Sequence, residues 1–242
     1  TPMLDGLAML SSFDTLWYVT ITPYGRDVEP YVPSKEQVMD SFRRLSTVVG
    51  SRRMSWRYDP VFITEKYSLS YHVEQFGKMA EALSGYTKQC VVSFIDLYEK
   101  TRRNFPTVRA VTPQEQEGVI SEFSKIAKAN GLQIHLCCEN ESLVRENVDA
   151  DGCMSKAVME SALGCRLEVP RKKPARSECQ CLLGADIGAY NTCGHGCLYC
   201  YANYEKETVI KNMKMHDATS PLLIGNITED DVIKTAEQRS WK

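Results

Sequence analysis

The chain has 242 residues, of which 43% are hydrophobic and 25% are charged, so it can bury a core of ordinary size and composition. Its formal net charge of -2 provides no global positive field of the kind that favours nucleic acid. No apolar run approaches the roughly 20 residues that cross a bilayer, and no signal-peptide pattern opens the chain. We therefore expect a cytoplasmic protein without membrane partners. Because the chain begins at Thr1 rather than Met, we also expect an incomplete N-terminus.

A strand-then-helix rhythm fills residues 12–165. β-rich apolar runs predict strands at residues 16–22, 53–58, 90–96 and 132–138, the second of them stopped by Asp59-Pro60. Helices are predicted between the strands and after the last one, at residues 34–49, 68–85, 112–131 and 155–163. Ser34, Ser68 and Thr112 are the expected N-caps of the first three helices.

The strands recur about every 35 to 40 residues, which is typical of right-handed βαβ units in a parallel sheet. This rhythm predicts an α/β fold, and a partial TIM-barrel-like repeat is favoured over an open doubly wound sheet. Composition and cysteine content change near Arg166. We expect four segments: a partial βα barrel at 1–165, a basic linker at 166–178, a Cys-rich cluster-binding module at 179–204, and a tail at 205–242 with a last helix from Thr228.

Ten cysteines are concentrated in the second half of the chain, and in a reducing compartment clustered thiols indicate metal more often than disulfides. Cys193, Cys197 and Cys200 have the spacing C-x3-C-x2-C. Three thiolates on one loop hold three irons of a [4Fe–4S] cluster and leave the fourth iron open. Gly194 and Gly196 let the backbone approach such a cluster. Tyr199 occupies the position from which a loop of this kind contacts a bound adenine.

Zinc is the alternative metal for this loop, because Zn²⁺ also binds cysteine pairs. Cys179 and Cys181 supply one pair, and His195 is a further candidate ligand. The cluster remains favoured, since a zinc ribbon usually has two short pairs rather than the x3-x2 spacing.

A second metal site, holding another iron–sulfur cluster or zinc, is predicted from four further cysteines that follow the fourth strand. These are Cys138, Cys153, Cys179 and Cys181. The competing interpretation is that several of them are ordinary buried thiols, an interpretation that fits Cys90 and Cys165 best.

The run Cys193-Gly-His-Gly-Cys-Leu-Tyr-Cys-Tyr-Ala202 resembles the cluster loop of radical S-adenosylmethionine (SAM) proteins, in particular the spore-photoproduct-lyase-like or DNA repair photolyase branch. The whole chain resembles the uncharacterised DUF1848 family still more closely. That resemblance is carried by the cysteine module, His216-Asp217 and the stretches at residues 20–25, 56–60, 93–98 and 220–225. The family usually begins with a further stretch that includes a Ser-Arg-Arg-Thr-Asp-like segment, which this chain lacks.

The first resemblance implies an enzyme that cleaves SAM reductively and abstracts hydrogen from an unknown substrate. It also implies a reductant such as a flavodoxin or ferredoxin, and by analogy alone a nucleic-acid substrate. One departure is that radical SAM loops typically follow the first barrel strand, whereas this loop follows the last predicted one. The alternatives are therefore a permuted barrel, an iron–sulfur electron-transfer protein without SAM, or a zinc-stabilised binding module.

Four polar residues stand at the ends of predicted strands, where a barrel has its catalytic face. They are Arg57, Asp59, Asp96 and Glu139. We expect them to bind the methionyl group of SAM, with a structural salt-bridge ring as the alternative. The sequence does not identify the catalytic residues.

Overall fold

The computed structural model describes residues 3–169, 179–182, 187–235 and 240–242. The chain divides into two compact units. The first unit consists of residues 1–24, 33–96 and 108–183, and the second consists of residues 25–32, 97–107 and 184–242. Most of the expected basic linker, residues 170–178, lies outside the described residues.

A five-stranded parallel sheet forms the centre of the first unit. The strands lie side by side in chain order. Their bounds are β1 Trp17–Thr20, β2 Met54–Val61, β3 Gln89–Phe94, β4 Gln133–Leu136 and β5 Val148–Asp149. The predicted α/β fold with a parallel sheet is confirmed, and β5 is a short strand that the sequence pattern did not predict.

The helices of the first unit follow the predicted rhythm closely. They are α1 Lys35–Val49, α2 Leu69–Leu83, α4 Pro113–Ala129 and α5 Lys156–Leu163, with short 3₁₀ segments at Leu4–Leu10, Ser51–Arg53 and Glu141–Leu143. The second unit contains α3 Glu99–Asn104 and α6 Lys206–Lys214, neither of which was predicted.

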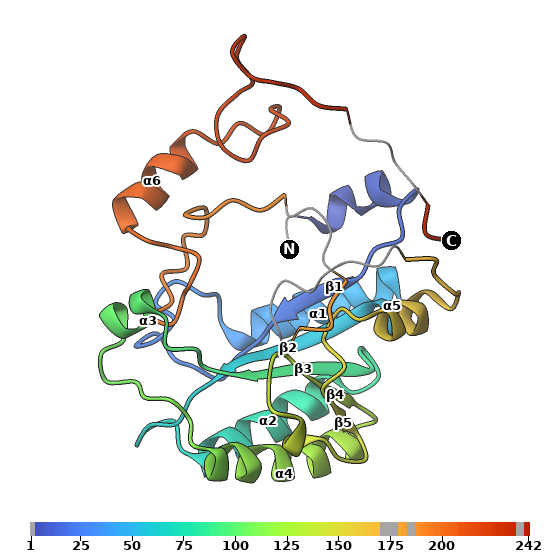
Figure 1. Cartoon of the computed structure of the whole chain (residues 1–242), viewed down its shortest axis with the longest axis vertical. Coiled ribbons are helices and arrows are strands. Elements are labelled where there is room, and N and C mark those ends of the chain that lie inside the picture. The colour runs from blue at the N-terminus through green and yellow to red at the C-terminus, as the bar shows by residue number, and fades with distance from the viewer. Residues whose placement is uncertain (1–2, 170–178, 183–186, 236–239) are drawn as a thin grey trace. The chain divides into compact units, whose positions relative to one another are not determined.

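The strand order determines where the connecting helices lie. Right-handed crossovers that always step in the same direction place their helices on one face of the sheet. Accordingly, α1 contacts α2, and α2 packs along α4 (Figure 1). A doubly wound sheet requires a reversal of strand order, and the five described strands contain none. The described strands do not close into a barrel either.

Aromatic side chains fill the space between the sheet and the helices. Trp56 and Tyr58 on β2 point toward α2 and α4, and both are fully buried. Phe76 on α2 stacks on Phe123 of α4 with ring centroids 3.8 Å apart, and on Trp56 at 4.9 Å. Because neighbouring residues of a strand point to opposite faces, Arg57 lies on the face away from these helices.

The predicted N-caps of α1, α2 and α4 are confirmed. Ser34 and Thr112 each form a capping box, with Gln37 and Glu115 respectively. The Ser68 hydroxyl accepts a hydrogen bond from the backbone N–H of Tyr71. These side chains satisfy backbone donors that the first helical turn leaves unpaired, which explains why the helices begin at these residues.

We expect Thr112→Ala to lower the free energy of unfolding by about 1 kcal/mol, because it removes the acceptor for the first turn of α4. The Thr112 hydroxyl oxygen accepts from the Glu115 N–H at 3.3 Å, and the Glu115 carboxylate accepts from the Thr112 N–H at 2.9 Å. Urea unfolding measures the change. Thr112→Ser keeps the hydroxyl and should unfold at the wild-type midpoint; a matching loss in the Ser variant would contradict the capping explanation.

Two sequence predictions of local structure are wrong. Asp59-Pro60 does not stop the second strand, since β2 continues to Val61. The pairing of β2 with β3 shifts between Tyr58 and Val61, so Pro60 lies at an irregularity where the sheet requires no N–H from it. The predicted helix from Thr228 is a turn in the described residues 228–235, where the Asp231 carboxylate accepts from the Thr228 N–H and hydroxyl.

Among the described residues, none of the helices combines the length and the apolar character that a membrane span needs.

Candidate functional site

The face of the sheet away from α1, α2 and α4 carries polar side chains on several neighbouring strands. The register aligns Arg57 with Val91, and Val91 with His135, across three neighbouring strands. In-register residues of parallel strands point to the same face. We call this face, defined by Tyr18, Arg57, Val91, Ser93 and His135, the polar face.

Arg57 and Asp59 form an ion pair at the carboxyl end of β2. The Ser93 hydroxyl donates to the second oxygen of the same carboxylate. Burial lowers the pKa of Arg57, but the adjacent Asp59 carboxylate outweighs that effect and raises it, so the guanidinium stays charged. The structure therefore shows the Arg57–Asp59 ion pair, which a structural salt bridge at the strand ends requires. The binding of SAM by these two residues stays a prediction.

Glu139 follows β4 and accepts a hydrogen bond from the Phe94 N–H at the end of β3, at 2.7 Å. Burial raises the pKa of Glu139 to about 7, and the charge of nearby Asp96 adds to this effect. The structure thus brings Glu139 and Asp96 together at the carboxyl edge of the sheet, while their expected role toward SAM stays a prediction. A carboxyl group that titrates near neutral pH is suited to proton transfer.

Four cysteines lie together beside this edge, and we call them the cysteine cluster: Cys137, Cys153, Cys179 and Cys181. The Cys153 sulfur lies 3.7 Å from the Cys137 sulfur and 3.6 Å from the Cys181 sulfur. Cys153, Cys179 and Cys181 are all buried.

The thiols of the cysteine cluster shift each other's pKa. The sulfur contacts with Cys153 lower the pKa of Cys137 to about 7 and that of Cys181 to about 6. The same two contacts raise the pKa of Cys153. Arg57 contributes to the lowered pKa of Cys137.

In the second unit, Cys193, Cys197 and Cys200 lie on one loop of turns, residues 193–200, which we call the cysteine loop. Gly196 has a φ of +67°, a value that strains residues with a side chain. Cys193 is exposed, whereas Cys197 and Cys200 are partly buried. Burial raises the pKa of Cys197 to about 11, and the charges of Glu29, Cys200 and Cys193 add to this effect.

Hydrogen bonds hold the cysteine loop at several points. The Leu198 N–H donates to the Val28 carbonyl at 3.0 Å, and the Asn203 side chain donates to the Cys193 carbonyl at 2.6 Å. The Tyr199 hydroxyl donates to the buried carboxylate of Glu29.

All ten cysteines lie in the described parts of the chain, and none of them forms a disulfide. Within the described ranges, no group of three or more His, Cys, Asp or Glu side chains is arranged to hold a metal ion. The metal predictions therefore stay predictions. The donor sets nevertheless suit a thiophilic metal, because each group consists of sulfur ligands close in space or in sequence.

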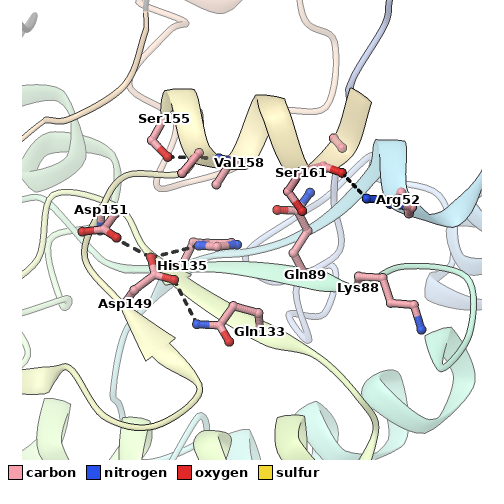
Figure 2. Close-up of a pocket in the computed structure, with 12 residues that line it drawn as sticks. Arg52, Lys88, Gln89, Gln133, His135, Asp149, Asp151, Ser155, Val158 and Ser161 are labelled. Carbon is pink, nitrogen blue, oxygen red and sulfur yellow. Dashed lines mark hydrogen bonds and ion pairs between the residues drawn. The ribbon is translucent and has the colours of Figure 1, made fainter. Parts of the chain in front are cut away.

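A pocket of about 280 Å³ lies at the other end of the polar face, between α5 and the amino ends of β3 and β4. Figure 2 shows His135 and Asp149 pointing toward each other there, with the His135 Nδ1 2.9 Å from an Asp149 oxygen. Gln133 donates to the second oxygen of Asp149 at 2.9 Å. Burial raises the pKa of Asp149, but the contact with His135 outweighs it and lowers the pKa. The structure thus places His135 beside Asp149.

Sequence reasoning missed two contributors to the cysteine cluster. Cys137, rather than the predicted Cys138, makes the sulfur contact with Cys153, while Cys138 packs beside the cluster. The Tyr18 hydroxyl donates to the Cys153 carbonyl at 2.7 Å. His195, a candidate ligand for zinc, instead contacts the Tyr31 carbonyl through Nδ1 at 3.2 Å.

The sequence profile of DUF1848, a domain of unknown function, matches residues 1–202. This match spans all five strands and the cysteine loop. No curated protein and no solved structure shows significant similarity to the chain.

Proposed function

The chain belongs to the DUF1848 family, and from this premise we propose that it is an iron–sulfur enzyme of the radical SAM type. Its [4Fe–4S] cluster is held by Cys193, Cys197 and Cys200. The observation that carries the proposal is the cysteine loop itself: three thiols within eight residues, with a turn between each consecutive pair and no disulfide among them.

The cysteine loop fits the ligand requirement of such a cluster. Sulfur is the donor that iron–sulfur clusters require, and three short-range thiolates leave one iron open. Gly196 lets the backbone turn between Cys193 and Cys197. Because Cys193 is exposed, a cluster bound here has an open side on which a small molecule can bind.

The residues around the cysteine loop restrict its movement. Glu29 fixes the hydroxyl of Tyr199, which directs the ring immediately before Cys200. On α3, Lys100 donates to the Tyr201 carbonyl and lies 3.1 Å from the centre of the Tyr204 ring. A cation held next to the loop offsets part of the negative charge of three thiolates.

When bound, the cluster supplies the electron for reductive cleavage of SAM to methionine and a 5′-deoxyadenosyl radical, which abstracts hydrogen from the substrate. The chain's own contribution in the second unit is to present three thiolates, to hold Tyr199 through Glu29, and to retain Lys100 beside the loop.

The partial barrel belongs to the same proposal. Consecutive parallel strands in chain order, with their crossover helices on one face, are the arrangement of neighbouring units in a βα barrel. The polar face would then point to the barrel interior, and its carboxyl edge would be the catalytic end.

The test is anaerobic reconstitution of the chain with iron and sulfide. We expect about four iron and four sulfide per chain, and loss of both in a Cys193→Ser, Cys197→Ser, Cys200→Ser triple variant. Cys165→Ser is the matched control, because Cys165 is a partly buried thiol outside the cysteine loop, and it should retain the cluster.

Adding SAM and dithionite to the reconstituted chain then tests the chemistry. Formation of 5′-deoxyadenosine and methionine supports the radical enzyme. A reduced cluster that yields neither product favours an electron-transfer protein instead. Zinc bound by the cysteine loop without labile sulfide would overturn the iron–sulfur proposal itself.

A further inference from the structure

The cysteine cluster in the first unit has a geometry that the cysteine loop does not share. Its sulfur atoms are already in contact, with Cys153 between Cys137 and Cys181 at 3.7 and 3.6 Å. Cys179 belongs to the same buried group. No described group of side chains already stands arranged around a metal ion, and from the sulfur contacts we propose that Cys137, Cys153, Cys179 and Cys181 close around a single zinc ion.

The sulfur–sulfur distances distinguish a single ion from a polynuclear cluster. Thiolates bound to zinc at about 2.3 Å in a tetrahedron stand about 3.8 Å apart. The separations of 3.6 Å between Cys153 and Cys181 and 3.7 Å between Cys153 and Cys137 are close to this value. Thiolates of a [4Fe–4S] cluster bind different iron atoms and lie further apart. A disulfide needs a separation of about 2.05 Å, which neither pair has.

The backbone around Cys181 supports a sulfur ligand. The Met154 N–H donates to the Cys181 sulfur at 3.2 Å, a contact that orients a thiolate. Gly152 makes this approach possible, because a Cβ on Gly152 would stand 3.3 Å from the Cys181 sulfur and its φ is +93°. The Tyr18 hydroxyl fixes the Cys153 backbone by donating to its carbonyl at 2.7 Å.

The surroundings of the cysteine cluster suit a closed, negatively charged zinc centre. Cys153, Cys179 and Cys181 are buried and Cys137 is partly buried, and burial of this kind is typical of structural zinc sites. Zinc with four thiolates has a net negative charge. Arg57 lies close enough to Cys137 and Cys153 for their charges to interact, and it provides the compensating positive charge.

Such a site would have a structural role in the first unit. Cys137 follows β4 and Cys153 precedes α5, whereas Cys179 and Cys181 belong to the described residues 179–182, which form neither helix nor strand. Zinc would therefore fix residues 179–182 to the carboxyl edge of the sheet.

The first experiment measures zinc in the full chain, purified under reducing conditions with zinc present, by mass spectrometry of the metal. We expect roughly one zinc per chain in wild type, and at least a tenfold loss in Cys153→Ser, because that change removes the central sulfur. Cys165→Ser is the matched control and should keep its zinc. The cysteine-loop triple variant should also keep it, which separates this site from the proposed iron–sulfur centre.

A second experiment needs no variant and therefore does not depend on the folding of Cys153→Ser. Wild-type chain is alkylated with iodoacetamide with zinc present, or after removal of zinc by a chelator, and the modified peptides are identified. We expect zinc to protect the four cluster cysteines and the chelator to expose them. Equal alkylation in both arms would overturn the proposal. So would a disulfide between Cys153 and a neighbour, or labile sulfide that Cys153→Ser removes.

Discussion

Phe76→Ala is expected to destabilise the chain by about 3–5 kcal/mol, the cost of removing a fully buried aromatic ring and leaving a cavity. Phe76 is 0% exposed and lies between Trp56 and Phe123, stacked on both. Its ring also meets the Tyr58 ring edge-on, with centroids 5.3 Å apart. Truncation therefore removes the group that joins α2 to both β2 and α4.

Urea unfolding followed by tryptophan fluorescence measures this loss, because Trp56 lies in the same stack and is buried. Phe13→Ala is the matched control: it is the same substitution at a side chain that is 59% exposed. The control should change the unfolding free energy by less than about 0.5 kcal/mol. A Phe76→Ala midpoint as close to wild type as that of Phe13→Ala would show that the aromatic stack does not hold the helices.

The sequence predicted the sheet and its helices because both rest on local rules. Ser34, Ser68 and Thr112 are strong N-caps, and each begins a helix in the structure. Buried parallel strands such as β3 are near-continuous apolar runs, which are visible in sequence.

The missed elements lack these local signals. β5 has only two residues and is formed by pairing with β4, a long-range contact that no local pattern encodes. α6 starts without a side-chain cap at Glu205. Thr228 shows the reverse case: the capping contacts to Asp231 are present, but the described residues 228–235 form only a turn and no helix. A cap satisfies the first turn of a helix, but it does not supply the packing that stabilises the rest.

The alternation of side chains along β4 could have identified Cys137, rather than Cys138, as the member of the cysteine cluster. The Cys137 N–H donates to the Val92 carbonyl at 3.0 Å, so the ladder of β4 extends to this residue. Cys137 therefore points to the same face as His135, two residues earlier, and joins the polar face. Cys138 has a φ of +57° and leaves the strand. The contact with Cys181 could not be predicted, because it is a long-range contact of residues 179–182, which form neither helix nor strand.

His72 gives a second large effect, which depends on pH. Its ring is fully buried on α2. Nε2 lies 2.9 Å from the Phe62 carbonyl, which can only accept, so Nε2 carries the proton. Nδ1 then accepts from the Tyr58 hydroxyl at 2.8 Å. This arrangement requires a neutral ring.

Burial lowers the pKa of His72 from 6.5 to about 4, although the bond to the Phe62 carbonyl opposes the shift. Between these two values the unfolded chain binds more protons than the folded chain, so stability falls as the pH falls. The full loss, reached below about pH 4, is roughly 3 kcal/mol.

We expect the unfolding free energy of wild type to decrease between pH 6.5 and 4 relative to His72→Gln, whose amide offers a donor and an acceptor but does not titrate in this range. His216→Gln, at an exposed histidine, should leave the wild-type slope unchanged. The ring chemical shift of His72 in the folded wild-type chain tests the same point without a variant. A titration midpoint of the His72 ring near pH 6.5 would contradict a buried neutral ring. If the ring stays neutral down to about pH 5, its burial and its contacts with Tyr58 and Phe62 explain why the folded chain loses stability in acid.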